Sequence, residues 1–183
     1  MEPSTLITPT ELKVARSRLS LFVHNEAQAT AQELGFGWRP AEITPQGVDG
    51  LTEEFRTCRV SGLPFRVLAD FSDDTIFNSA STNHAMRFWH DTRHVWLGAD
   101  FSTEAELDVA SCHLARAKAE GFEPSSLEYA LLQADTVGQT VYVARSHRFV
   151  THQLQFAMDC VRLSLDQAIE REMLRSVIEG SAT

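Results

Sequence analysis

Hydrophobic residues recur at a spacing of three to four positions over much of the chain, which is the pattern of helices that bury one face. The first such stretch covers residues 8–35 and predicts one long helix that ends at Gly35. The same pattern returns over residues 82–97, just before Gly98, and again over residues 103–120 after a hydroxyl side chain that can cap a helix.

The C-terminal third continues with helical spacing. Residues 127–135 predict a short helix. Residues 138–147 are ambiguous, because their β-branched side chains favour a strand while their apolar positions keep helical spacing, and we favour a helix. Residues 149–178 are long enough to form one terminal helix.

Residues 36–74 break this pattern, because glycines and prolines divide them into short segments such as Phe55–Val60 and Leu63–Asp70. Such segments predict loops with a hairpin or a small sheet. We therefore predict a mainly α protein, a single-domain helical bundle of about five helices with a small β element between residues 36 and 70.

The composition fits one globular domain over residues 1–183, because 43% of the residues are hydrophobic. The net charge of -9 gives the protein no excess of basic residues. It therefore argues against nucleic acid or an anionic membrane as the partner, since binding either one requires clustered Lys and Arg. The sequence contains no apolar run of about 18 residues, so it predicts no membrane span. Three cysteines without a CxxC pattern and a start unlike a leader peptide predict a reduced, cytoplasmic protein, and a homo-oligomer stays open.

The predicted helix over residues 82–97 separates into an apolar and a polar arc on a helical wheel. A polar arc is also what a solvent-facing helix shows, so it does not establish a site by itself. Arg87 lies four residues before Asp91, and we expect an ion pair between them. The apolar arc consists of Ala85, Phe88, Trp89, Thr92, Val95 and Trp96, and the polar arc of Asn83, Arg87, His90, Asp91 and His94.

Glu106 lies beside apolar positions of the next predicted helix, so its carboxylate points at least partly inward and has to be paired or bound to a cation. The short loop before that helix turns the chain back and brings Glu106 to the preceding helix. His90 and His94, one turn apart, together with Glu106 are suitable ligands for Zn²⁺, Fe²⁺ or Mn²⁺. Asp91 can join them as a fourth ligand, or it can contact a ligand from outside the coordination sphere.

The run His90-Asp91-x-x-His94, eleven further residues and Glu106 resembles the HDxxH-x11-E zinc motif of a ubiquinone (coenzyme Q) biosynthesis family. That family is implicated in removing the ring C1 carboxyl group of coenzyme Q precursors. The match covers residues 90–106. The resemblance implies a mainly helical fold, zinc ligation by His90, Asp91, His94 and Glu106, and a hydrophobic quinone precursor or prenyl chain bound nearby.

Two other classes of metal enzyme share part of this pattern and fit less well. An HD-domain phosphohydrolase needs a further His on an earlier helix, and His84 lies well away from His90 on the wheel. A zincin-like peptidase has Glu directly after its first His as the general base, and Asp91 is a shorter acid in that position.

The sequence thus predicts a metal-binding protein, with Zn²⁺ as the leading ion and Fe²⁺ or Mn²⁺ as alternatives. As an enzyme it would be a lyase (decarboxylase) or a hydrolase acting on a small-molecule substrate. His113 would be a hydrogen-bond partner of a ligand or a general acid or base, and the structural alternative is a partly buried histidine with no role in the site. The alternative is a non-enzymatic accessory or interaction protein with a structural metal site or no metal. In its favour, the NxAxRxxHDxxH pattern over residues 83–94 resembles uncharacterised phage or plasmid proteins.

Overall fold

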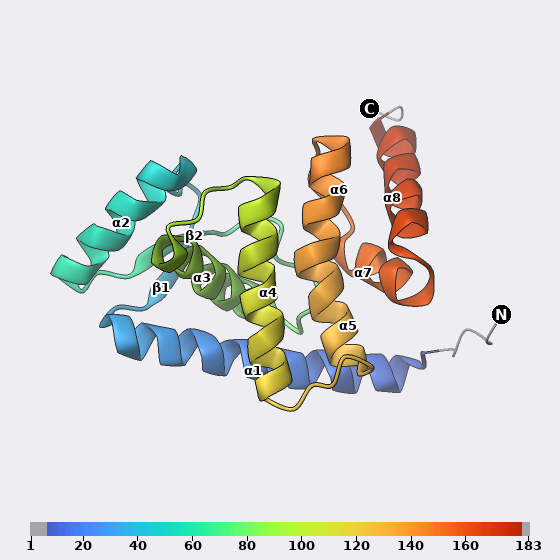
Figure 1. The fold of residues 1–183 in the computed structure, drawn as a ribbon, viewed down its shortest axis with the longest axis horizontal. Coiled ribbons are helices and arrows are strands. Elements are labelled where there is room, and N and C mark those ends of the chain that lie inside the picture. Colours follow the sequence, from blue (N-terminus) through green and yellow to red (C-terminus); the bar gives the residue numbers. More distant parts are fainter. Residues whose placement is uncertain (1–6, 181–183) are drawn as a thin grey trace.

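The structure, a computed structural model, describes residues 7–180 and is mainly α-helical, as predicted (Figure 1). The described residues form eight α-helices, one π-helical turn and two short strands. In chain order these are α1 (Pro9–Leu34), β1 (Trp38–Ala41), α2 (Gly47–Ser61), β2 (Phe65–Leu68), α3 (Ala80–Leu97), α4 (Thr103–Ala119), α5 (Leu127–Gln133), η1 (Ala134–Gly138), α6 (Gln139–Ser146), α7 (Gln153–Arg162) and α8 (Leu165–Gly180).

The three helices predicted for the first two thirds of the chain are confirmed, and side chains define their ends. Thr8 and Glu11 form a reciprocal capping box at the start of α1. Ser102 caps α4 by accepting a hydrogen bond from the backbone of Ala105. Gly98 ends α3 in the left-handed conformation at φ 61°, which a residue without a β-carbon adopts at little cost.

The β element lies within residues 36–70 as predicted, but it is a parallel pair rather than a hairpin. Parallel strands need a crossover connection, and α2 supplies it. Residues 55–60, which we expected in a loop or strand, therefore lie in a helix. The signal for α2 is the helical spacing of its buried side chains Leu51, Phe55 and Cys58.

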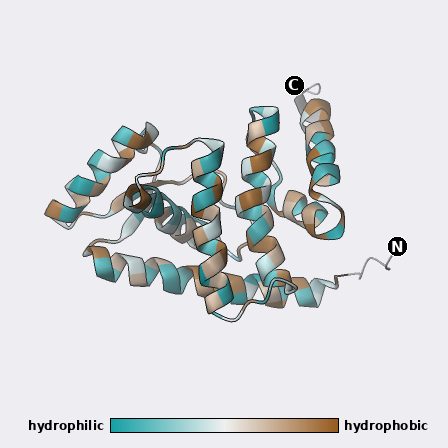
Figure 2. Cartoon of the chain, viewed as in Figure 1, coloured by the Kyte–Doolittle hydropathy of each residue, from teal (hydrophilic) through white to brown (hydrophobic). Residues whose placement is uncertain are grey.

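Helix α3 is the central element, because it packs against α1, α2, α4 and both strands (Figure 1). Phe88 stacks on Trp38 of β1 with ring centroids 5.0 Å apart, and Trp89 meets Phe22 of α1 edge to face at 5.6 Å. Trp96, which we expected in the core, is 37% exposed instead, because it lies at the end of α3. The mixture of hydrophilic and hydrophobic residues along each helix reflects this one-sided burial (Figure 2).

The predicted terminal helix over residues 149–178 is wrong, because the structure divides it into α7 and α8. Ser164 and Gln167 make reciprocal hydrogen bonds between their side chains and backbone N–H groups. This is a second capping box, and it starts a new helix where the hydrophobic spacing alone continues the old one. The break and the unexpected α2 raise the number of helices above the five that we predicted.

The short helix predicted over residues 127–135 ends at Gln133 and passes into the π-helical turn η1, which leads directly into α6. The favoured helix over residues 138–147 is confirmed by α6. At Gly138, a β-carbon would lie 3.3 Å from the ring of Phe156. This close approach fixes the end of η1 against α7.

A buried ion network joins α7 to α8. The carboxylate of Glu172 is fully buried and accepts hydrogen bonds from the backbone of Thr151 at 3.0 Å and from Nε of Arg175 at 2.8 Å. Arg175 also binds the buried carboxylate of Asp159 at 2.8 Å. No side chain of its own caps the start of α7, so Glu172 supplies the negative charge there from the neighbouring helix.

We expect Glu172→Gln to lower the free energy of unfolding by about 1.5–3 kcal/mol, because Arg175 loses one of its two carboxylate partners and keeps only Asp159. Urea denaturation followed by circular dichroism measures this loss. The matched control is Asp166→Asn, which removes the exposed ion pair with Arg145 and should cost less than about 1 kcal/mol. Equal effects of both variants would contradict a stabilising role of the buried network.

Candidate metal centre

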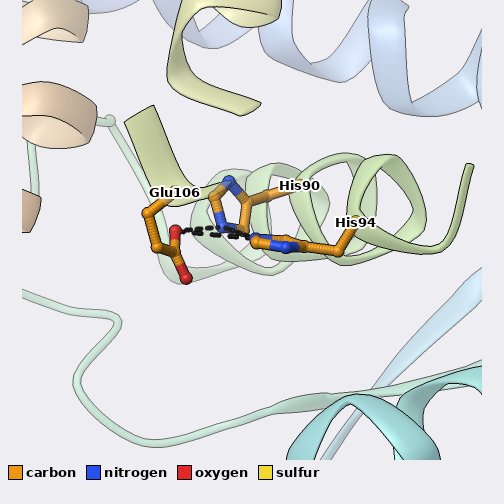
Figure 3. Close-up of side chains that lie close together, drawn as sticks. All are labelled: His90, His94 and Glu106. Atoms are coloured by element: carbon orange, nitrogen blue, oxygen red, sulfur yellow. Dashed lines mark hydrogen bonds and ion pairs between the residues drawn. The ribbon is translucent and has the colours of Figure 1, made fainter. Parts of the chain in front are cut away.

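The side chains of His90, His94 and Glu106 meet between α3 and α4 (Figure 3). His90 and His94 lie one turn apart on α3, so both rings project from the same face. The chain then turns back within a short loop, where Asp100 accepts a hydrogen bond from the backbone N–H of Ser102 at 2.9 Å. This turn places Glu106, in the first turns of α4, opposite the two histidines.

The three candidate ligand atoms form a nearly equilateral triangle. Nε2 of His90 lies 3.0 Å from Nε2 of His94 and 3.2 Å from Oε2 of Glu106, and Nε2 of His94 lies 3.5 Å from the same oxygen. A tetrahedral ion with bonds of about 2.0–2.2 Å holds its ligand atoms about 3.3–3.6 Å apart, and an octahedral ion about 2.8–3.1 Å apart. The triangle therefore has the size of one face of a metal coordination sphere.

Burial separates this cluster from a solvated helix face. The side chain of His94 is 0% exposed, and those of His90 and Glu106 are 24% and 25% exposed. Asn83, at the start of the same polar arc, is also buried and binds the hydroxyl of Ser72 at 3.1 Å. This part of α3 is therefore not a solvated face, and Glu106 points towards the histidines as predicted. Ion pairs between the two helices without a metal remain the alternative.

The second nitrogen of each ring has its own partner. Nδ1 of His94 lies 3.4 Å from the carbonyl oxygen of Ala99, and Nδ1 of His90 lies 3.3 Å from Nε2 of His113 on α4. Both Nδ1 atoms are thus occupied by protein groups. Both Nε2 atoms are directed at Glu106, which is the arrangement that a shared cation requires.

Without a cation, protons on the histidines hold the cluster together. Burial opposes the charged form of Glu106, but hydrogen bonds from His90 and His94 outweigh it and lower the pKa of Glu106 to about 2. Burial likewise opposes the charged form of His90, yet the hydrogen bond and charge of Glu106 raise the pKa of His90 above its usual 6.5. A metal ion would replace these protons.

Asp91, predicted as a fourth ligand, lies beside the triangle but not in it. Burial raises the pKa of Asp91, while the nearby charges of His90 and His94 lower it. The expected ion pair with Arg87 does not form within the described residues, because the Arg87 guanidinium donates to the carbonyl oxygen of Leu68 at the end of β2. Ligation by Asp91 stays a prediction.

Asp135, which no sequence pattern singles out, lies in η1 close enough to the cluster to feel the charge of His90. Burial raises the pKa of Asp135 to about 6, against the opposing effects of the His90 charge, a 2.8 Å hydrogen bond from Gln139 and the Arg87 charge. No motif spacing connects Asp135 to the HDxxH run. The only local signal is an acid in a segment whose helical register is interrupted, and π-helical turns often occur at functional sites.

The remaining histidines discussed above lie elsewhere, apart from His113. Nε2 of His84 contacts the carbonyl oxygen of Ala69 at 3.2 Å, which agrees with its exclusion as a ligand. His113 is fully buried, and its Nε2 lies 3.3 Å from Nδ1 of His90, so its role as a partner of a ligand stays a prediction. Its role as general acid or base stays a prediction.

Comparison with known protein families, characterised proteins and solved structures finds no match to this chain. The structural findings on the site therefore rest on its own geometry.

Within residues 7–180, no helix is both long enough and apolar enough to cross a membrane. The three cysteines Cys58, Cys112 and Cys160 are free thiols.

The ion pair of His90 with Glu106 predicts how the stability of the metal-free protein depends on pH. The low pKa of Glu106 stabilises the fold above pH 4.5, and this contribution is lost as the pH falls towards about 2. The raised pKa of His90 stabilises the fold below pH 6.5, and this contribution is lost as the pH rises through the folded-state pKa. Both act together between these two values.

We therefore expect Glu106→Gln to reduce the stability of the chelator-treated protein most between pH 4.5 and 6.5. The difference from the parent protein should shrink as the pH falls below 4.5 towards about 2, where the contribution of Glu106 is lost, and as the pH rises through the raised folded-state pKa of His90. Thermal unfolding across this pH series measures it. Glu104→Gln, an exposed acid in the same turn of α4, serves as the control, and an equally large effect at every pH would refute the ion pair.

Proposed function

We propose that this protein is a metal-dependent enzyme that binds one divalent cation through His90, His94 and Glu106 and acts on a small molecule. Zn²⁺ is the leading ion, and Fe²⁺ and Mn²⁺ are the alternatives. The observation that carries the proposal is the triangle of two imidazole nitrogens and one carboxylate oxygen, with sides of 3.0, 3.2 and 3.5 Å. Two histidines and a carboxylate suit all three ions.

The number of ligands supports a catalytic rather than a structural ion. Structural zinc sites are closed by four protein ligands, whereas catalytic sites combine three protein ligands with an open position. The described residues bring three side chains into the triangle. His90 and Glu106 are each about a quarter exposed, so solvent or substrate can reach the open position from their side.

A cation with an open position supplies Lewis-acid chemistry, by polarising a substrate oxygen or by lowering the pKa of a coordinated water. Asp135 and Asp91 are the residues best placed to hold or accept a proton nearby, because both are acids whose pKa values burial raises. The motif resemblance favours decarboxylation of an aromatic or quinone-like carboxylate. The set of two His and one Glu favours hydrolysis equally well.

An interaction protein is the second candidate, and the surface of α8 favours it. Leu174, Val177 and Ile178 are all at least 59% exposed on this helix. A shallow hollow of about 320 Å³, lined by Leu163 and Leu174 among others, lies beside them. These side chains could meet a partner whether or not a metal is bound between α3 and α4.

Metal analysis of protein purified without chelator tests the metal site on which the first candidate depends. We expect stoichiometric metal in the parent protein and its loss in both His94→Ala and Glu106→Ala, because each variant removes one corner of the triangle. His84→Ala, a histidine of the same helix outside the cluster, should keep the metal. Parent protein without metal, whose melting temperature does not change on chelation, would refute the proposal.

Asp91→Asn tests whether the ion has an open position. Because the Asp91 carboxylate lies outside the triangle, we expect this variant to retain stoichiometric metal. X-ray absorption of the zinc form should then show the same first shell in the parent protein and in Asp91→Asn. Loss of the metal in this variant would make Asp91 a fourth ligand and favour a closed, structural site.

A further inference from the structure

The pairing of His90 with His113 connects the candidate metal centre to the interior of the protein. Nδ1 of His90 and Nε2 of His113 are 3.3 Å apart, and the two ring centroids are 5.4 Å apart. His113 lies two helical turns beyond Glu106 on α4, so one helix carries both a candidate ligand and the partner of another. A neutral imidazole has one donor and one acceptor nitrogen, so the state of each ring constrains the other.

We infer that His113 is a positioning residue that accepts a hydrogen bond from Nδ1–H of His90 and thereby commits Nε2 of His90 to the metal. The inference rests on the proposed metal site. A cation on Nε2 of His90 leaves the ring proton on Nδ1, which can only donate. The Nε2 of His113 that faces it must then carry a lone pair, and the proton of His113 must lie on its own Nδ1.

The surroundings of His113 hold its ring in this orientation. The Trp89 ring lies against it with centroids 4.0 Å apart, and the side chain of His113 is fully buried. Its Nδ1 has no hydrogen-bond partner among the described residues. A histidine enclosed in this way has no direct contact with solvent, so its position suits holding another ring rather than acid–base catalysis.

The unpartnered Nδ1 is the observation that separates this role from ordinary packing. A buried polar atom without a partner costs about 1–3 kcal/mol, so an apolar side chain would fill the same space more favourably. The contact of Nε2 with His90 is the one hydrogen bond of the His113 side chain in the described part of the chain. The side chain therefore contributes an acceptor to His90 at a cost to the fold.

His94 shows the same arrangement with a different acceptor. Its Nδ1 faces the carbonyl oxygen of Ala99, which belongs to the backbone and is present whatever the side chain. The acceptor of His90 is a side chain, so substitution can remove it. Loss of such an outer partner typically weakens metal binding by about 10–100-fold.

The test compares Co²⁺ binding by the full-length parent protein, His113→Leu and His113→Gln, measured by competition with a chromogenic chelator. Leu fills the space without an acceptor, whereas Gln carries a side-chain oxygen at about the distance of Nε2 and can accept from His90. We expect His113→Leu to bind Co²⁺ about 10–100-fold more weakly and His113→Gln to recover most of the affinity. His84→Leu, on the same helix as His90 but outside the cluster, should bind like the parent.

Two further measurements make the outcome unambiguous. The melting temperature of each chelator-treated variant shows whether the fold is retained, and His113→Leu should be no less stable than His113→Gln. Should His113→Leu fail to fold, ¹⁵N NMR of the zinc-loaded parent protein replaces it. The expected spectrum has a protonated Nδ1 on both His90 and His113, and a protonated Nε2 on His113 would overturn the inference.

Equal Co²⁺ affinity of the parent and a folded His113→Leu would also overturn the positioning role while leaving the metal site intact. Equal weakening by Leu and Gln would overturn it too, because packing would then explain the effect. A parent protein that binds no Co²⁺ would refute the metal site itself. The failure of the positioning role is thus distinguishable from the failure of the proposed function.

Discussion

The contact of Glu106 with His90 and His94 is the interaction on which the arrangement of the site depends. A carboxylate on the inner face of α4 is costly unless positive charge or a cation meets it, and two rings of α3 lie opposite. The helix ends around the loop make this meeting possible. Gly98 stops α3, and Ser102 starts α4 only a few residues later. A short rigid turn therefore sets the distance between the two helices at this level.

Helix α3 can carry a polar cluster because the opposite face of the helix is anchored so firmly. Phe88 and Trp89 pack on β1 and α1, while His90 and His94 face α4. Rigid support of this kind keeps ligand atoms close to their working geometry before an ion arrives. The cost of ordering the side chains is then met during folding, which leaves more of the interaction energy for binding.

Local chemistry made much of this fold predictable from the sequence. Capping residues and terminal glycines can be read from the sequence, and they gave both ends of α1 and α4 and the C-terminal end of α3 to within one residue. The start of α3, at Ala80 after the cap Ser79, lies two residues before the predicted one. The HDxxH spacing and the inward position of Glu106 likewise predicted the triangle that the structure forms. Such features depend on residues close together in the chain or on one helix–helix contact.

Other features depend on tertiary packing and were missed. The break between α7 and α8 follows from the pair Ser164 and Gln167, whose signal was masked by a continuous hydrophobic spacing. Asp135 reaches the site only because η1 changes the helical register, which no residue pattern announces. The orientation of Arg87 towards β2 rather than towards Asp91 required knowledge of where the strand ends.

The π-helical turn also ties the length of this segment to the site. A π turn holds about one residue more than an α-helical turn, so η1 accommodates an extra residue between α5 and α6. If residues 134–138 formed a regular α-helix with the same number of residues, α5 and α6 would be rotated by about 100° relative to each other. Either Asp135 would leave the vicinity of His90, or Tyr142 would leave its contact with Phe156. The number of residues here, as much as their identity, therefore keeps the acid and the C-terminal helices in place together.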